Sequence, residues 1–306
     1  MKNALIILGM HRSGTSALMG ALKLSGVDLG KDLMGETADN AKGYFENKKI
    51  VDFNEDLLDL LQHRWNDVFL IDTNKLKELS ENESLEQKAI SIIKHEFETS
   101  SLIGIKDPRM CILFPFWSDI LQTMGYTVNV ILPHRDPVEI AKSLEKRNDF
   151  TIEFSLLLWA KHALYAEKYS RNFQRIFISY HDLLESPEKQ IKNIYSAFLL
   201  PLSENGLVAL NSFIDKNLNR SSQKKSESCD MPSFIQDLIS AYVACTKQDT
   251  TCEVDIFDKL YNDYIFYTSF FLNRTTETLM HEKVQRFQKQ KTVSKKIENF
   301  FKQFRK

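Results

Sequence analysis

Two glycines separated by four residues enclose the part of the sequence best suited to bind an anion. Gly9 and Gly14 flank a short loop that follows the apolar run 4–8 and precedes a segment with helical spacing. In a strand–loop–helix unit, backbone N–H groups and the positive end of the helix favour an anionic ligand at the loop. The same segment adds a guanidinium and two hydroxyl groups as donors: Arg12, Thr15 and Ser16. The sequence therefore predicts a loop that binds phosphate or sulfate.

This loop differs from an ATP-binding loop at one position. The spacing of Gly9 and Gly14 matches the Walker A motif, but Thr15 stands where that motif has the lysine that clamps the β- and γ-phosphates. A P-loop kinase-like phosphotransferase stays as an alternative, because 68–72 and 102–107 each form an apolar run that ends in aspartate, as Walker B strands do. A plain structural corner made by the two glycines is the other alternative.

Further cations and hydroxyl groups follow apolar runs later in the chain. Lys106 and Arg109 follow one such run and Arg135 follows the next. Ser143 comes eight residues after Arg135, in the second turn of a predicted helix. An arginine at a strand end and a serine in the following helix can both reach one phosphate group. Tyr180 follows a further apolar run, where an aromatic ring either anchors the strand end or contacts a ligand.

The elements that must position these side chains alternate between strands and helices. Such alternation predicts a parallel sheet covered by helices on both faces, with ligands at the carboxyl ends of the strands. That edge would collect Arg12, Lys106 and Arg135. We therefore expect an α/β fold, a three-layer sandwich with a central parallel sheet and a P-loop-like donor site. Strands are predicted near 4–9, 102–106, 127–133 and 175–179, and helices over 14–26, about 48–63, 84–98, 112–124, 137–147 and 153–171.

The last third of the chain has a different composition. No glycine follows Gly206, and only Pro232 interrupts the remainder, which favours an α-helical C-terminal extension. The basic end of the chain would lie either on an anionic membrane, as peripheral contact, or against its own domain. We predict three parts: an α/β core over 1–220, a helical extension over 221–280, and a basic amphipathic helix or tail over 281–306.

Taken together, these motifs resemble the sulfotransferases that use 3′-phosphoadenosine 5′-phosphosulfate (PAPS), in the bacterial branch of that family. The resemblance rests on Arg-Ser-Gly-Thr-Ser over 12–16, on Lys-Gly-Tyr-Phe-Glu over 42–46, and on Arg135 with Ser143 eight residues later. It covers about 1–220. The late Arg-Lys-Gly segment of the cytosolic eukaryotic subgroup is absent, which separates the chain from that subgroup.

The resemblance implies a sulfotransferase that takes PAPS as donor and needs no metal. It gives a catalytic role to Arg12, at the 5′-phosphosulfate, and to Lys106, at the leaving oxygen. Arg135 and Ser143 would hold the 3′-phosphate, and Tyr180 would lie near the adenine. The donor would be bound by Arg12, Ser13, Gly14, Thr15, Ser16, Arg135, Ser143 and Tyr180.

A hydroxyl acceptor also requires a general base. Glu46 is the first candidate and Glu36 the second, because 107–109 reads Asp-Pro-Arg where some family members have a histidine. Alternatively, Glu46 is an N-cap or an ion-pair carboxylate ahead of the next helix, and the aliphatic part of the Lys106 side chain lies along the strand end. The expected acceptor is a small molecule or glycan, and most simply a carbohydrate or glycan precursor, although no residue specifies a sugar. An inactive relative that acts as a binding protein is a further alternative.

The histidines and cysteines show no metal-ligand spacing. His11 and His134 adjoin cations, but a lone histidine in a loop is more often structural, so we assign neither a role. In a chain of this length the cysteines suggest reduced thiols rather than a disulfide framework. They are Cys111, Cys229, Cys245 and Cys252.

Composition narrows the classes of partner. The net charge of −1 and the 26% of charged residues give the chain no basic field for nucleic acid. The apolar run 5–8 is too short for a signal peptide or a membrane span. We therefore expect a cytoplasmic enzyme, and the resemblance to the bacterial branch implies a bacterial one.

Overall fold

The computed structural model describes residues 2–35, 43–202, 207, 209–214, 231–247 and 253–269. The chain divides into two compact units, Met1–Tyr261 and Asn262–Lys306. In the second unit the described residues, 262–269, are helical. The boundaries predicted at 220 and 280, the basic segment 281–306 and the second base candidate, Glu36, lie outside the described residues and stay predictions.

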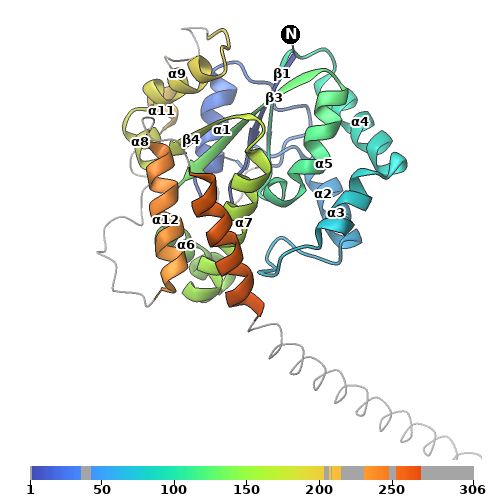
Figure 1. The fold of residues 1–306 in the computed structure, drawn as a ribbon. Helices are drawn as coiled ribbons and strands as arrows, with labels where there is room; N and C mark the ends of the chain where they lie inside the picture. Colours follow the sequence, from blue (N-terminus) through green and yellow to red (C-terminus); the bar gives the residue numbers. More distant parts are fainter. Residues whose placement is uncertain are drawn as a thin grey trace, which may run out of the picture. The chain divides into compact units, whose positions relative to one another are not determined.

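A four-stranded parallel sheet forms the centre of the first unit (Figure 1). The strands are β1 (Lys2–Ile7), β2 (Leu102–Lys106), β3 (Tyr126–His134) and β4 (Gln174–Ser179). Their order is β2-β1-β3-β4, and Ile7 at the end of β1 pairs with Lys106 on one side and Ile131 on the other. The four predicted strands are confirmed, and their carboxyl ends meet at one edge.

All six helices predicted between residues 14 and 171 are confirmed as well. These are α1 (Thr15–Leu24), α2 (Lys48–Leu60), α4 (Glu83–Phe97), α5 (Met110–Thr123), α6 (Pro137–Asn148) and α7 (Ile152–Ser170). Shorter helices that we did not predict are α3 (Thr73–Ser80), α8 (Tyr180–Glu185), α9 (Pro187–Ala197) and α11 (Leu210–Phe213). In the last third, α12 (Ser233–Thr246) and a helix over 254–269 agree with the expected helical composition.

Side-chain caps fix where several of these helices begin. The Asn47 side chain accepts a hydrogen bond from the Ile50 backbone N–H at 3.3 Å and so starts α2. Asp136 accepts from the Val138 N–H at 2.8 Å and is followed by Pro137, which fits the first helical position of α6. These caps set α2 and α6 directly after the segments that carry the candidate site residues.

Helices cover both faces of the sheet, so the three-layer α/β architecture is confirmed. On one face α1, α8, α9 and α11 pack on side chains such as Leu5, Ile7 and Ile131, which form one apolar core. On the other face α5, α7 and α12 pack on β3 and β4, and the Phe177 ring lies 5.4 Å from that of Tyr242 in α12. Alternate residues of each strand therefore face different layers.

The cysteines depart from our expectation. Of the two that lie in described residues, Cys111 is buried and free, whereas Cys245 is disulfide-bonded. The prediction that all the thiols are reduced is therefore wrong for Cys245. Sequence spacing shows only that the cysteines form no ligand motif; it does not show which sulfur atoms approach one another in the fold.

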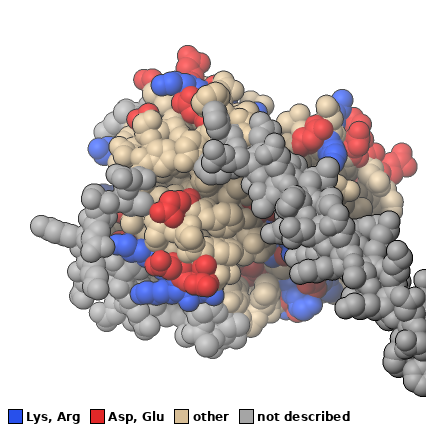
Figure 2. Space-filling view, turned by 90° about the horizontal axis from the view of Figure 1, so that it is seen from below, with Lys and Arg blue, Asp and Glu red and all other residues tan. Residues whose placement is uncertain are grey.

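Charged side chains of both signs are interspersed on the face drawn in Figure 2, and over the described residues that face shows no continuous basic area. Within the described part of the chain, no helix is both long enough and apolar enough to cross a bilayer. The expectations about nucleic acid, membrane contact and cellular location stay predictions.

Candidate functional site

The loop between β1 and α1 has a backbone that requires glycine at one position. Gly14 caps α1 with a φ of 85°, in the left-handed region. A Cβ atom at this position would lie 2.2 Å from Cδ2 of Tyr180, so the tyrosine ring packs directly on the loop. Arg12 also has a positive φ, 68°, which is uncommon for a residue with a side chain.

Four predicted donor residues meet at this loop, and we call Arg12, Arg135, Ser143 and Tyr180 the donor group. Arg12 donates from Nε to Oγ of Ser143 at 2.7 Å. Arg135 donates from Nη1 to the backbone carbonyl of Arg12 at 3.0 Å, and its guanidinium carbon lies 4.9 Å from the centre of the Tyr180 ring. Glu139 accepts from Nε of Arg135 at 3.0 Å and sets the orientation of the guanidinium.

The hydroxyl-bearing residues of the loop lie closer to the protein interior. Ser13 and Thr15 are buried, and the Ser13 backbone N–H donates to the carbonyl of Met10 at 3.3 Å within the turn. Ser16 donates from Oγ to the carbonyl of Tyr44 at 3.3 Å. The predicted donor-binding residues are thus gathered in one place, and their roles stay predictions.

Lys106 binds three groups at once, and all of them belong to the candidate site. Its Nζ lies 3.1 Å from Oγ of Ser16, 3.0 Å from the carbonyl of Tyr44 and 2.5 Å from Oε1 of Glu46. An ammonium group has three hydrogen atoms, so these contacts use all of its donor capacity. In this arrangement Lys106 fastens the segment around Glu46 to the start of α1.

Two of the three candidate catalytic residues, Lys106 and Glu46, form a buried ion pair. The side chains of Lys106 and Glu46 are 3% and 4% exposed. Burial raises the pKa of Glu46, and the nearby Asp107 raises it further, while the pairing with Lys106 opposes both effects. A carboxylate with a raised pKa is a stronger base than an exposed one, which suits a role in proton abstraction. The alternative that Glu46 caps α2 does not fit, since Asn47 caps that helix, whereas the alternative that Glu46 forms an ion pair agrees with its contact with Lys106.

Glu96 in α4 holds the backbone next to Glu46 in place. Its fully buried carboxylate accepts hydrogen bonds from the backbone N–H groups of Lys31 and Asp32, both at 2.9 Å, and from Nδ2 of Asn47 at 2.7 Å. Lys49 adds an ion pair at 2.9 Å. One buried carboxylate therefore connects the backbone at Lys31 and Asp32 to Asn47, the residue that caps α2.

Arg109, the possible second cation, is engaged by carboxylates. It donates from Nη1 to Oδ1 of Asp107 at 2.8 Å and from Nε to Oε1 of Glu55 at 2.7 Å. Asn54 donates to the other oxygen of Asp107 at 2.8 Å and accepts from the indole N–H of Trp117 at 2.7 Å. Burial opposes the charge of Arg109, but the two carboxylates outweigh it and raise the pKa. This network fixes the end of β2, from which Lys106 projects.

Sequence reasoning assigned no role to a group of aromatic and basic side chains beside the loop. The His11 ring lies edge-on to Trp65, with 4.4 Å between the ring centres. The guanidinium carbon of Arg147 lies 5.8 Å from the centre of the Trp65 ring, and Phe150 packs near the same indole at 6.1 Å. Trp65 belongs to the irregular segment after α2, so no periodicity in the sequence indicated that it would reach the loop.

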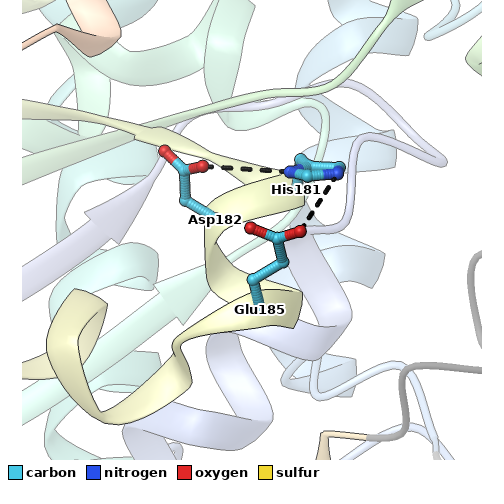
Figure 3. A group of neighbouring side chains, drawn as sticks. All are labelled: His181, Asp182 and Glu185. Carbon is cyan, nitrogen blue, oxygen red and sulfur yellow. Dashed lines mark ion pairs between the residues drawn. The ribbon is translucent and has the colours of Figure 1, made fainter.

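A group of possible metal ligands lies on α8 (Figure 3). Nδ1 of His181 is 3.9 Å from Oδ1 of Asp182, and Nε2 of the same ring is 3.6 Å from Oε1 of Glu185. All three side chains are exposed, and such groups commonly occur on surfaces without an ion. The contacts drawn in Figure 3 are those of a surface ion-pair cluster on a short helix, which contributes little to stability.

Solved structures of sulfotransferase domains resemble this chain. The sulfotransferase domain of the Synechococcus PCC 7002 olefin synthase aligns with a TM-score of 0.50 and 15% identity, over 79% of this chain and 96% of that domain. The sulfotransferase domain from the curacin biosynthetic pathway aligns with a TM-score of 0.48 and 13% identity, over 78% of this chain and 97% of that domain. No protein-family model matches the sequence, and no curated protein does.

At these identities the likeness concerns the fold. The chain has the fold of the bacterial sulfotransferases, as its motifs predicted. The fold brings the ends of the parallel strands to one edge, whereas the reaction and its substrates have to be argued from the side chains themselves.

Proposed function

We propose that the protein transfers a sulfuryl group from PAPS to a hydroxyl group of an acceptor. The observation that supports this proposal most directly is the donor group, in which Arg12, Arg135 and Ser143 meet over a loop closed by Gly14. Arg12 donates to the Ser143 hydroxyl group and Arg135 donates to the backbone carbonyl of Arg12, so two guanidinium groups and a hydroxyl group gather at one loop, which suits a ligand with two anionic ends.

The residues present fit the donor on structural grounds. Gly14 lets the Tyr180 ring pack directly on the loop, because any side chain at this position would collide with that ring. Arg12 would contact the 5′-phosphosulfate, while Arg135 and Ser143 would contact the 3′-phosphate. When bound, PAPS supplies the sulfuryl group and leaves as adenosine 3′,5′-bisphosphate (PAP). The missing Walker A lysine, replaced by Thr15, speaks against ATP as the donor.

Glu46 is the base in this proposal. Its carboxylate takes the proton of the acceptor hydroxyl as the acceptor oxygen bonds to sulfur and the bond from sulfur to the 5′-phosphate oxygen breaks. Lys106 holds Glu46 and carries a positive charge beside the loop. Arg12 stabilises the negative charge that moves onto the leaving phosphate. In this proposal Lys106 positions Glu46. Lys106 would contact the leaving oxygen only after releasing one of its three hydrogen-bond partners.

The acceptor we propose is a carbohydrate or glycan precursor. This part rests on the bacterial character of the motifs, because the side chains around the loop are suited to hydroxyl groups in general. The cytoplasmic location belongs to the same proposal.

Two experiments test the proposal. Isothermal titration with PAP and with ATP–Mg²⁺ should show tighter binding of PAP; a preference for ATP–Mg²⁺ would favour the kinase-like alternative. Transfer from radiolabelled PAPS to a panel of glycans, lipids and phenols should label at least one acceptor. PAP binding without transfer to any acceptor would instead support an inactive relative that acts as a binding protein.

Variants make the test specific. Arg12→Ala should abolish PAP binding, because it removes the guanidinium at the loop. Lys77→Ala is a matched control, since Lys77 is an exposed cation on α3, with a side chain that is 75% exposed. If both variants weaken PAP binding equally, general charge rather than the donor group is responsible.

A further inference from the structure

The helical residues of the second unit, 262–269, have one buried face and one exposed apolar face. Tyr264 and Thr268, which are one turn apart, are 0% and 4% exposed. In contrast, Ile265 and Phe266 are 42% and 68% exposed. The helix therefore presents two adjacent, large apolar side chains to the solvent.

The exposed side of this helix can leave water at low cost. Its hydroxyl groups already bind the backbone of the same helix: Ser269 donates to the carbonyl of Phe266 at 2.7 Å, and Thr268 donates to that of Tyr264 at 2.8 Å. A hydroxyl group with such a partner loses less on transfer to an apolar medium than one that depends on water. The exposed residues carry no charge; they are Asn262, Ile265, Phe266 and Ser269.

The sequence continues the apolar character beyond the described residues. No residue from 264 to 273 is charged, and Phe270, Phe271 and Leu272 follow Ser269 directly. A helix that crosses a bilayer needs about 20 apolar residues, so this run is too short to span one. Aromatic and aliphatic residues in a short run suit the boundary between lipid headgroups and acyl chains.

The chain has a strong charge asymmetry after this run. Residues 281–306 contain nine lysine or arginine residues and two glutamates, which gives a net charge of +7. Because the whole chain has a net charge of −1, residues 1–280 carry a net charge of −8. Over the described residues, the face drawn in Figure 2 shows charges of both signs and no continuous basic area. The excess of positive charge therefore belongs to the segment that follows the apolar run.

An anionic bilayer would use both features. Its headgroups attract a basic segment, and its interface takes up apolar side chains; stable attachment to a membrane surface generally needs two such signals. A nucleic acid, or the acidic part of the protein itself, would neutralise the basic segment. Neither of these partners would require exposed apolar side chains at Ile265 and Phe266.

We propose that residues 262–306 bind the surface of an anionic lipid bilayer. Ile265 and Phe266 enter the interface, and the basic side chains of 281–306 lie at the lipid phosphates. The contact is peripheral, and it does not depend on the donor group or on the proposed sulfuryl transfer.

Co-sedimentation of the full chain with lipid vesicles tests the proposal. One set of vesicles contains phosphatidylcholine alone, and the other, the anionic vesicles, contains two parts phosphatidylcholine to one part phosphatidylserine. The protein should bind the anionic vesicles at least about a hundredfold more tightly, because each basic residue near the surface adds to the attraction, and added salt should weaken this binding. Absence of binding to the anionic vesicles, or equal binding to both sets, would overturn the proposal.

A pair of charge variants tests the basic segment. Replacing Lys295 and Lys296 together by glutamine should weaken binding to the anionic vesicles about thirtyfold. The matched control replaces Lys75 and Lys77, two exposed lysines on α3, in the same way and should bind like the unaltered protein. Equal losses in the two double variants would show that binding follows total charge and would contradict the assignment to 281–306.

A second pair tests the apolar contact. Phe266→Ser should weaken binding to the anionic vesicles about tenfold, the effect of an apolar side chain that no longer leaves water. Leu60→Ser is the matched control, because Leu60 is 62% exposed on α2 in the first unit. Ile265→Ser gives an independent measure, and urea unfolding shows whether each variant is folded. If folded Phe266→Ser and Ile265→Ser both bind like the unaltered protein, the apolar residues do not enter the interface and the proposal is wrong.

A DNA duplex distinguishes a membrane from a polyanion. The unaltered protein should bind the duplex more weakly than the anionic vesicles. Equal or tighter binding of the duplex would overturn the proposal in favour of a nucleic acid partner. None of these measurements uses PAPS or PAP, so their failure would leave the proposed function standing, and absence of PAP binding would leave the membrane contact standing.

Discussion

Glu96→Gln is the substitution whose effect on stability follows most directly from the structure. The carboxylate of Glu96 is buried at the point where the chain before the site, Lys31 and Asp32, meets Asn47, the cap of α2. Each of these neighbours donates a hydrogen bond to it. The glutamine retains one accepting oxygen but turns an amide N–H₂ toward groups that are themselves donors.

The pKa of Glu96 gives the magnitude. Burial alone would raise it, but hydrogen bonds from the Asp32 backbone, Lys49, Asn47 and His95 together lower it from 4.5 to about 2. That difference corresponds to about 3 kcal/mol of folding free energy, which the ionised side chain contributes at neutral pH. Because the pKa is lower in the folded state, this contribution is complete above 4.5 and is lost as the pH falls toward 2.

Urea unfolding followed by tryptophan fluorescence at a series of pH values measures the effect. At pH 7, Glu96→Gln should lower the free energy of unfolding by about 3 kcal/mol. The difference between the two proteins should shrink as the pH falls below 4.5, since protonated glutamate resembles glutamine. Glu78→Gln, an exposed glutamate on α3, is the matched control and should follow the unaltered protein at every pH.

Two results would refute this reasoning. If Glu96→Gln is as stable as the unaltered protein at pH 7, the hydrogen bonds to the carboxylate do not favour its charge. If the loss is the same at pH 7 and at pH 3, the effect comes from packing and not from ionisation.

Three further substitutions test the site. Glu46→Gln should leave PAP affinity unchanged and depress turnover, and normal turnover of the variant would show that Glu46 is not the base. In the unaltered protein, kcat/KM should fall as the pH is lowered, with an apparent pKa above 4.5, because burial raises the pKa of Glu46. Lys106→Met leaves a buried carboxylate without its cation and should cost about 3–5 kcal/mol in urea unfolding, while Glu46→Gln in the same chain should recover much of it; independent, additive losses would show that the two side chains are not coupled. Gly14→Ala should weaken PAP binding at least tenfold in isothermal titration, since a Cβ atom meets the Tyr180 ring and the φ of 85° is strained for alanine; unchanged binding would mean that Tyr180 is not fixed on the loop.

The sheet could be predicted from the sequence because its strands are short, continuous apolar runs that follow a regular alternation with helices. β2 begins and ends at the predicted residues, β3 extends one residue beyond its prediction at each end, and β4 begins one residue earlier than predicted. β1 begins and ends two residues before its predicted bounds. The strand order β2-β1-β3-β4 was not predicted, because apolar runs that are all buried on both faces do not distinguish central from edge positions. Short helices such as α3 and α8 were missed, since a few turns give too little periodicity.

The donor group was predictable for a different reason. Arg12 and Ser143 are 131 residues apart, but each belongs to a segment that directly follows a parallel strand. Strand ends meet at one edge of a parallel sheet, so a motif tied to a strand end can be placed without knowledge of the loops. The same argument placed Arg135 and Lys106 at that edge.

The contacts of the side chains were beyond sequence reasoning. That Lys106 uses all three of its hydrogen atoms depends on the path of the segment around Tyr44, which has no regular structure. That Trp65 lies on His11 depends on a segment without periodicity. The Cys245 disulfide likewise depends on proximity in the fold. Irregular segments carry these contacts, and composition says nothing about their course.

The central claim is that the donor group recognises both anionic ends of one nucleotide. The most direct measurement compares the dissociation constants of PAP and 5′-AMP, which lacks the 3′-phosphate, in the unaltered protein, in Arg135→Ala and in Ser143→Ala. In the unaltered protein PAP should bind about tenfold to a hundredfold more tightly, as expected for hydrogen bonds to a charged group. Each substitution should reduce that ratio while leaving 5′-AMP binding nearly unchanged. Equal affinities for PAP and 5′-AMP in the unaltered protein would contradict the claim.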